Sequence, residues 1–299
     1  MTGPRLFCFG LGYSALALAD RLLPQGWRVA GTTRAQEKAQ ALAARGIETF
    51  LFDRGRPLAD PSRALAGTTH VLSAVPPDRD GDPVLDRHGG DLAGPGLAWA
   101  GYLSTTGVYG DHDGGWVDEA TPRVPTGARG RARLAAEDGW LELWRRHGVP
   151  VHLFRLPGIY GPGRSAIDAL RAGTARRIDK PGQVFSRIHV EDIARVLEAS
   201  MARPNPGADY NVCDDEAGPG HEVVAHAARL LGVEPPPLVP FEAADLSPMA
   251  ASFYADSKRV RNDRIKRELG VRLAYPTYRD GLAAQLSAER GAHGKREKP

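Results

Sequence analysis

The N-terminal apolar segment runs directly into a glycine turn, and this junction constrains the fold more than any other feature. The turn reads Gly10-x-Gly12-x-x-Ala15 and opens an amphipathic helical pattern. Gly10 permits a tight turn, Gly12 lets the backbone approach a phosphate, and Ala15 allows close helix–strand packing. The N–H groups and positive dipole end of the helix then favour an anion. We expect a dinucleotide pyrophosphate at Gly10, Gly12, Tyr13, Ser14 and Ala15; the alternative is a glycine turn without a ligand.

The segment about twenty residues further along favours one form of the dinucleotide. A second strand is predicted over 27–33, and Arg34 follows it. Sites that prefer NAD usually carry Asp or Glu here, which binds the ribose 2′-hydroxyl. This chain has Thr32, Thr33 and Arg34 instead, and a guanidinium can pair with a 2′-phosphate. The sequence therefore predicts NADP(H) as the preferred cofactor and leaves NAD(H) open. The alternative for Arg34 is a solvated residue at the start of the next helix.

Strand and helix patterns continue to alternate along the chain. Further strands are predicted over 46–53, 70–75, 99–104, 150–156 and 209–213, with a helix over 131–147. Repeated strand–helix units predict an α/β fold, a Rossmann-type doubly wound parallel sheet with helices on both faces. Ligands of such sheets bind beyond the carboxyl ends of the strands. The residues expected at the cofactor from those ends are Asp53, Ala74, Pro76 and Pro157.

The pattern becomes less regular after residue 160, and this change predicts a second part. Residues 1–160 with about 187–215 form the expected dinucleotide-binding domain. Residues 161–186 and 216–287 form the expected smaller C-terminal substrate lobe. The tail 288–299 has no apolar face and is predicted to be disordered. The Asp- and Gly-rich stretch 78–94 is predicted to be a mobile loop.

Composition and charge exclude several classes of partner. A net charge of +3 is too small to indicate nucleic acid or an anionic membrane, and the basic run 258–267 reads as one charged helix face. No apolar stretch approaches the roughly eighteen residues of a membrane span. Cys8 and Cys213 read as buried thiols of a reducing cytoplasm. His221 and His226 are one residue too far apart for a shared helix face, so no metal site is expected. We expect a cytoplasmic monomer or homodimer with a small-molecule substrate.

Several strings of the sequence together resemble one known family. In chain order they are Gly10-x-Gly12-x-x-Ala15, Tyr102–Gly110, Arg155–Arg164, Arg187–Ala194 and Tyr210–Asp215. In this order they resemble the extended short-chain dehydrogenases/reductases, also called the NAD-dependent epimerase/dehydratase family. The chain is most similar to the atypical bacterial branch of sugar-epimerase-like proteins. The resemblance covers nearly the whole chain.

The resemblance implies a catalytic set that this chain retains only in part. Typical members use Ser or Thr with a Tyr-x-x-x-Lys pair, in which Tyr exchanges a proton with the substrate oxygen and Lys lowers the Tyr pKa. By this alignment Thr105 stands at the hydroxyl position. Arg129 stands at the Tyr position, and Arg133 stands at the Lys position. Arginine keeps its proton near neutral pH, so Arg129 cannot be an ordinary acid.

Other residues are candidates for the missing chemistry. Tyr109 and Tyr160 lie near strand ends and are candidate proton donors; the alternative is that each packs in its Tyr-Gly turn. Thr105 relaying a proton through water, and a substrate with its own acidic group, are also left open. By resemblance Arg164 and Arg187 are expected to bind substrate, with a surface salt bridge as the alternative.

The sequence supports three hypotheses about function. The first is an NADP-dependent oxidoreductase or epimerase for a sugar-like or small polar carbonyl or hydroxyl substrate. The second is a non-catalytic NADP(H)-binding redox sensor or regulator, which the missing Tyr-x-x-x-Lys pair favours. The third is a lyase or isomerase that uses its cofactor transiently.

Overall fold

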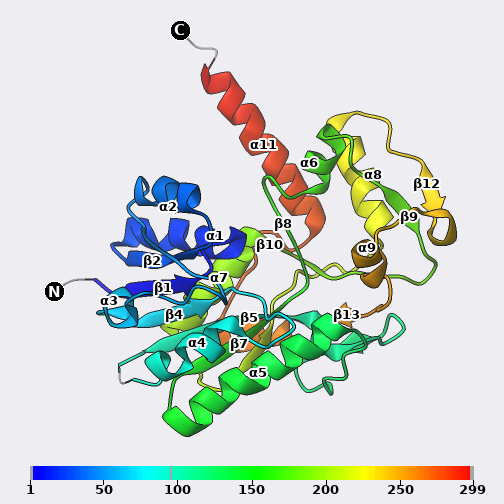
Figure 1. The fold of residues 1–299 in the computed structure, drawn as a ribbon. Helices are drawn as coiled ribbons and strands as arrows, with labels where there is room; N and C mark the ends of the chain where they lie inside the picture. Colours follow the sequence, from blue (N-terminus) through cyan, green and yellow to red (C-terminus); the bar gives the residue numbers. More distant parts are fainter. Residues whose placement is uncertain (1–2, 95, 297–299) are drawn as a thin grey trace.

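The computed structural model describes residues 3–94 and 96–296, and its centre is a parallel seven-stranded sheet (Figure 1). The strand order is β11-β7-β5-β4-β1-β2-β3 within the described part of the chain. This order reverses between β1 and β4, as in a doubly wound sheet, and confirms the predicted Rossmann-type fold. The strands are β1 Arg5–Phe9, β2 Arg28–Thr33, β3 Glu48–Leu51, β4 His70–Ser73, β5 Trp99–Thr105, β7 Val151–Leu156 and β11 Asp209–Asn211.

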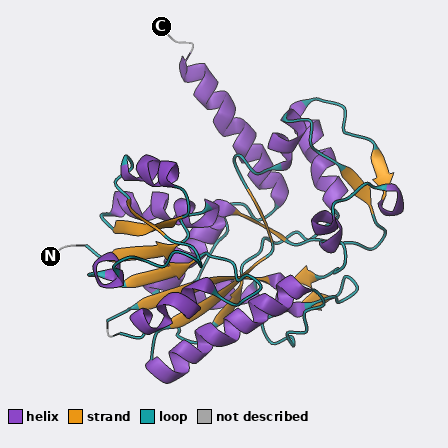
Figure 2. Ribbon diagram, in the orientation of Figure 1, coloured by secondary structure: helices purple, strands orange, loops and turns teal. Residues whose placement is uncertain are grey.

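Alternating side chains of β1 build two cores, one on each face of the sheet. Leu6 and Cys8 belong to the core beneath one helical layer, and Phe7 and Phe9 belong to the other; all four are fully buried. A strand covered on both faces reads as a continuous apolar run, as this one does. Figure 2 shows the helices on both sides of the strands. One layer holds α1 Tyr13–Leu22, α2 Gln36–Ala43 and α7 Val190–Ala202; the other holds α3 Pro61–Leu65, α4 Pro83–Leu92 and α5 Ala128–His147.

Helix α4 occupies the stretch that was predicted to be a mobile loop, so that prediction is wrong. Asp82 caps the helix by accepting hydrogen bonds from the N–H groups of Val84 and Leu85, and Pro83 stands at the first helical position. Both are favoured helix-start residues. Trp140 of α5 also donates its indole N–H to Asp82 at 3.0 Å. The cap and this contact fix the segment against α5.

A smaller lobe is built from segments that follow residue 160. Strand β8 (Gly158–Tyr160) leads into it and pairs in parallel with β10 (Arg187–His189), which leads back to α7. The lobe itself contains α6 Ala166–Arg171, β9 Arg177–Asp179, α8 Gly220–Leu231, β12 Leu238–Pro240, η3 Phe241–Ala243 and α9 Pro248–Ser252. Strands β9 and β12 pair, and Figure 1 shows the lobe beside the sheet.

The chain leaves the lobe within the expected segment 216–287 and returns to it with its last helix. Strand β13 (Arg259–Val260) pairs with β6 (Trp116–Val117), which is attached to the sheet domain. Helix α10 (Asp263–Leu269) then contacts α7 and β11. Its Ile265 and Leu269 lie in the same core as β1. The apolar face of α10 therefore belongs to the sheet domain, although charged side chains obscure it in the sequence.

The predicted disordered tail is helical as far as the structure describes it. Helix α11 (Tyr278–Arg296) buries Leu282 and Leu286 against the lobe, and Figure 1 shows it projecting away from the sheet. An ion pair of 2.6 Å between Arg171 and Glu289 extends the anchored part. A helix nucleated on this apolar face can propagate through polar residues. Residues 297–299 lie outside the described part.

Candidate functional site

The glycine turn forms an open cradle at the N-terminus of α1. Gly10 has φ +85°, a conformation that favours glycine, and a Cβ there would lie 3.1 Å from Val75 Cγ2. At Gly12 no atom lies within 4 Å of the Cβ position. The N–H groups of Tyr13, Ser14 and Ala15 have no acceptor within the described residues. Open space beside three unpartnered donors fits a pyrophosphate.

The end of β2 holds this turn in shape. Thr32 accepts the Gly10 N–H on its side-chain oxygen and the Leu11 N–H on its carbonyl, both at 2.8 Å. Gly31 lets β1 and β2 approach, since a Cβ there would lie 2.4 Å from the Cys8 carbonyl oxygen. In the sequence, Thr32 was noted only because this segment lacks the Asp or Glu that is typical of sites preferring NAD. The structure shows that its hydroxyl positions the turn.

Two arginines lie together just beyond β2. Arg34 is exposed, and its guanidinium has no hydrogen bond or ion pair with the part of the chain that is described. Arg56 donates to the Arg34 carbonyl at 2.8 Å and to Asp53 Oδ2 at 3.1 Å. The Asp53 carboxylate is therefore partly neutralised by Arg56. Sequence analysis singled out Arg34 and Asp53 but missed Arg56, whose only signal was its place in the turn after β3.

The carboxyl ends of β4, β5 and β7 bring three of the expected residues to one edge. Ser73 is paired with Tyr102, and Thr105 is paired with Leu156, so Ala74, Thr105 and Pro157 follow one another along this edge. Pro76 continues the segment after Ala74. Thr105 is half-buried, and its Oγ1 accepts the Gly107 N–H at 3.1 Å, which caps η2 (Thr106–Tyr109). The hydroxyl of Thr105 retains its proton as a donor.

The two arginines of α5 have different environments. Arg133 is half-buried and donates to the Leu103 carbonyl oxygen and, at 3.3 Å, to the Tyr102 hydroxyl. Arg129, one turn earlier, is exposed and lies over the ring of Phe253 at 5.0 Å. The two side chains thus frame the N-terminal end of α5 near β5, but neither can act as a proton donor near neutral pH.

The two tyrosine candidates are held away from this chemistry. Tyr109 is buried, donates to Asn211 Oδ1 at 2.8 Å and accepts from Arg155 Nη1 at 2.9 Å. Burial raises the Tyr109 pKa to about 12. Tyr160 donates to the Thr277 carbonyl oxygen at 3.3 Å, and burial raises its pKa strongly. Because its hydroxyl is used in a buried network, the structure favours the alternative that Tyr109 packs in its turn over a role as the catalytic substitute.

The centre of that network is Glu137, which sequence reasoning did not include in the site. Glu137 is fully buried and accepts two hydrogen bonds from Arg155, at 3.0 and 2.9 Å. It also accepts from Arg123 Nη1 at 3.0 Å and from Ser104 Oγ at 2.6 Å. Ser104 precedes Thr105, so the network fixes α5 to the end of β5. Its sequence signal is the Arg133-x-x-x-Glu137 spacing, one helical turn.

The two expected substrate arginines lie in separate places. Arg164 is exposed, 5.8 Å from the ring centroid of Tyr13, whose hydroxyl donates to the Pro162 carbonyl oxygen at 3.0 Å. It therefore lies beside the glycine cradle. Arg187 is 9% exposed and donates to the carbonyl oxygens of Phe185 and Gly218, both at 2.9 Å. These donors brace the main chain, an arrangement that favours a structural role over the expected binding of substrate.

Two further sequence interpretations concern cations and cysteines. Arg264 pairs with Asp209 at 2.7 Å and Lys266 with Asp215 at 2.6 Å, so the basic run is neutralised by acids of the sheet domain. Cys8 and Cys213 are buried thiols, and burial raises both pKa values, that of Cys8 to about 12.

Across 3–94 and 96–296 no group of three metal-ligating side chains occurs. No helix in these ranges has the length and apolar character to cross a membrane.

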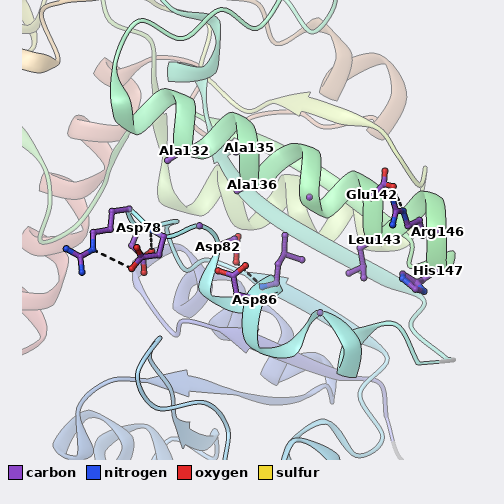
Figure 3. Close-up of a pocket in the computed structure, with 16 residues that line it drawn as sticks. Asp78, Asp82, Asp86, Ala132, Ala135, Ala136, Glu142, Leu143, Arg146 and His147 are labelled. Carbon is purple, nitrogen blue, oxygen red and sulfur yellow. Dashed lines mark hydrogen bonds and ion pairs between the residues drawn. The ribbon is translucent and has the colours of Figure 1, made fainter.

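A cavity of about 670 Å³ lies away from these residues, between α4 and α5 (Figure 3). Small and apolar residues form part of its lining, namely Leu85, Gly89, Ala132, Ala136 and Gly139. None of the cradle residues and none of the strand-end residues discussed above borders it. We therefore assign the site to the strand ends and not to this cavity.

Comparisons with known proteins agree with the fold and the motifs. The profile described as "NAD dependent epimerase/dehydratase family" matches residues 97–213. A functionally unknown conserved protein from Silicibacter pomeroyi is 55% identical over 95% of this chain and 99% of its own, with a TM-score of 0.89. Protein YeeZ of Escherichia coli K12 is 29% identical over 276 residues, 89% of this chain and 94% of that protein.

A more distant structure extends the likeness of fold to a complex with cofactor. UDP-glucuronic acid 4-epimerase from Bacillus cereus, in complex with UDP-glucuronic acid and NAD, is 15% identical over 96% of this chain and 99% of its own, with a TM-score of 0.78. The doubly wound sheet, the open glycine cradle and the matched profile agree with one another. Residues 97–213 therefore belong to the NAD-dependent epimerase/dehydratase family, and the whole chain has the fold seen in the structures compared with it.

Proposed function

We propose that the protein is an NADP(H)-dependent enzyme of oxidoreductase or epimerase type, acting on a small carbonyl or hydroxyl substrate that carries negative charge. One observation carries the proposal: the open cradle at Gly12 stands at the same sheet edge as Thr105 and Pro157. The nicotinamide cofactor, when bound, supplies the hydride chemistry. Epimerisation and net reduction both begin from such an arrangement.

The cofactor preference rests on the end of β2. We propose that the N–H groups of Tyr13, Ser14 and Ala15 hold the pyrophosphate and that Arg34 pairs with the 2′-phosphate. Arg56 supports this preference because it neutralises Asp53, the nearest acid of that turn named above. Both effects favour NADP(H) over NAD(H).

Thr105, Arg133 and Arg129 have different roles toward the substrate. Thr105 donates a hydrogen bond from its hydroxyl to the substrate oxygen, since one of its lone pairs already accepts the Gly107 N–H. Arg133 keeps a fixed positive charge at the end of β5, and Arg129 attracts the anionic group of the substrate. Because neither arginine releases a proton, water or the substrate's own acidic group supplies it.

Two measurements on the wild-type protein test the proposal. We expect calorimetry to detect NADPH binding and to show tighter binding than for NADH. We also expect NADPH oxidation with an anionic carbonyl substrate. Binding of NADPH without turnover of any anionic carbonyl would favour the second candidate, a redox sensor or regulator. The presence of Arg129 at the position where typical family members have Tyr also supports this candidate. No binding of either nucleotide would contradict both.

We further propose that the protein works in the cytoplasm, since its two cysteines are buried reduced thiols in separate cores. Light scattering would distinguish the expected monomer from the expected homodimer.

A further inference from the structure

We infer that the substrate carries an aromatic ring beside its anionic group, and that Phe253 and Arg129 bind these two parts. The inference rests on the proposed function and narrows its substrate class. Four observations support it. They concern the free N–H donors of Arg129, the aromatic residues near Phe253, the contacts that connect both residues with the segment after Thr105, and the partners of the nearby cations.

Arg129 is held in place but keeps its donors. Its guanidinium lies over the Phe253 ring at 5.0 Å and makes no hydrogen bond or ion pair within the described residues. Arg131 and Arg133 on the same helix both donate to carbonyl oxygens. Stacking on a ring restricts a guanidinium while leaving its in-plane N–H groups available for a carboxylate. Arg129 is therefore a pre-oriented site for one anionic group.

Aromatic side chains continue from Phe253 into the lobe. Phe253 is 53% exposed. The next residue, Tyr254, contacts Phe185 at 5.3 Å and Phe241 at 5.2 Å between ring centroids. We call Phe185, Phe241, Phe253 and Tyr254 the aromatic cluster. A half-exposed ring whose chain neighbour packs among other rings favours a ligand with an aromatic group of its own.

The aromatic cluster is tied to the strand-end edge. The Nζ atom of Lys258 donates to the Gly110 carbonyl oxygen at 2.6 Å, and Thr126 donates to Asp256 Oδ1 at 2.6 Å. Gly130, beside Arg129, packs so tightly that a Cβ there would lie 2.8 Å from the Gly107 carbonyl oxygen. The Gly107 N–H also donates to Thr105 Oγ1. The start of α5, with Arg129 and the Phe253 ring beneath its guanidinium, therefore packs against the segment that follows Thr105.

The cations around the aromatic cluster determine how much negative charge this place can accept. Lys180 donates to the Tyr254 carbonyl oxygen, Lys258 is bound to Gly110 and Asp256, and Arg187 braces two carbonyl groups. Within the described part of this region, Arg129 alone among these cations lacks such a partner. One such guanidinium matches one carboxylate through two parallel N–H···O bonds, whereas the two charged phosphates of a nucleotide-sugar would share this single cation. The geometry thus favours an aromatic carboxylate over a nucleotide-sugar.

Four probes separate these contributions in the full-length protein saturated with NADPH, which cannot oxidise an alcohol. They are 3-phenylpropionate, propionate without a ring, 3-phenylpropanol without a charge, and UDP-glucose. Calorimetry should show that 3-phenylpropionate binds about tenfold or more tightly than each of the others. Equal binding of propionate, or tighter binding of UDP-glucose, would overturn the inference.

Two variants assign the parts, with Arg145→Gln as the control at the far end of α5. Arg129→Gln should abolish the preference for 3-phenylpropionate over 3-phenylpropanol, and Phe253→Leu should abolish the preference over propionate. Arg145→Gln should change neither, because among the described residues Arg145 pairs only with Glu142, at 3.5 Å. Unchanged preferences in Arg129→Gln or Phe253→Leu contradict the assignment. A titration of the wild-type protein with NADPH alone separates this failure from failure of the proposed function. If the proposed function is wrong, the wild-type protein does not bind NADPH.

Discussion

Arg155 of β7 and Glu137 of α5 form a buried bidentate ion pair, with Nε–Oε1 at 3.0 Å and Nη2–Oε2 at 2.9 Å. Two parallel N–H···O bonds fix the guanidinium and the carboxylate in one plane. Because Glu137 also accepts from Ser104, the pair determines where α5 stands relative to Thr105. The position of Arg129 and Arg133 therefore depends on a residue that touches neither cofactor nor substrate.

Replacing Glu137 with alanine should destabilise the protein by about 3–5 kcal/mol, because the buried Arg155 charge loses its bidentate partner and keeps, among the described acids, only the single contact with Asp209 at 2.6 Å. Urea unfolding measures this loss. A double-mutant cycle with Arg155→Met is the control, since removing both charges should cost less than the sum of the single changes. Additive losses would show that the pair is not coupled.

Replacing Gly12 with valine should abolish NADPH binding while the fold survives. The Cβ position of Gly12 meets no atom within 4 Å, so the new side chain occupies the space proposed for the pyrophosphate instead of clashing with protein. Circular dichroism checks the fold and calorimetry measures binding. A folded variant with wild-type NADPH affinity would show that the nucleotide binds elsewhere.

Replacing Arg34 with alanine should remove the preference for NADPH over NADH. One charge-assisted phosphate contact contributes about 1.5–3 kcal/mol, which corresponds to about tenfold or more in affinity. Affinities for both nucleotides should be measured by calorimetry. Arg45→Ala is the matched control, because this exposed arginine pairs with Asp20 of α1. A preference that persists in Arg34→Ala would contradict the assignment.

The sequence predicted the sheet and the cradle because each depends on local patterns. A buried strand requires a continuous apolar run, and a phosphate-binding turn requires small residues at the spacing of Gly10, Gly12 and Ala15. Both requirements can be read from residues that are neighbours in the sequence. The roles of Tyr109 and Arg187 were not readable in this way. Their partners, Asn211 for Tyr109 and Gly218 for Arg187, are distant along the chain and meet them only when β10 and β11 are in place.

Stability should fall as the pH drops from about 6.5 to about 4, in part because of His152. Burial lowers the pKa of this fully buried imidazole to about 4, and its Nε2 accepts the Asn205 N–H at 2.8 Å. The unfolded chain binds this proton first, so the stabilisation is complete above about pH 6.5 and is lost toward pH 4. The shift corresponds to about 3 kcal/mol at most.

Urea unfolding across this pH range, with wild type and His152→Asn, measures the contribution. The variant should be less stable at pH 7 and should lose less stability on acidification, because it has no imidazole to protonate. Parallel curves for the two proteins would show that His152 does not take up a proton on unfolding.

Generic ketone and aldehyde reduction by the wild-type protein should be very slow. The helix positions that carry Tyr and Lys in typical family members are occupied by Arg129 and Arg133, and an arginine delivers no proton at neutral pH. The structure strengthens this expectation, because Tyr109, the nearest alternative named by the sequence, is buried and bound to Arg155 and Asn211. The measurement is NADPH oxidation against a panel of simple carbonyl compounds, with wild type and the double variant Arg129→Tyr/Arg133→Lys. The double variant should be faster if the Glu137 network places the new tyrosine beside Thr105, and Arg145→Lys serves as the control for changing a charged residue of α5. Fast wild-type turnover of simple carbonyls would show that another group supplies the proton, and it would exclude the non-catalytic alternative at the same time.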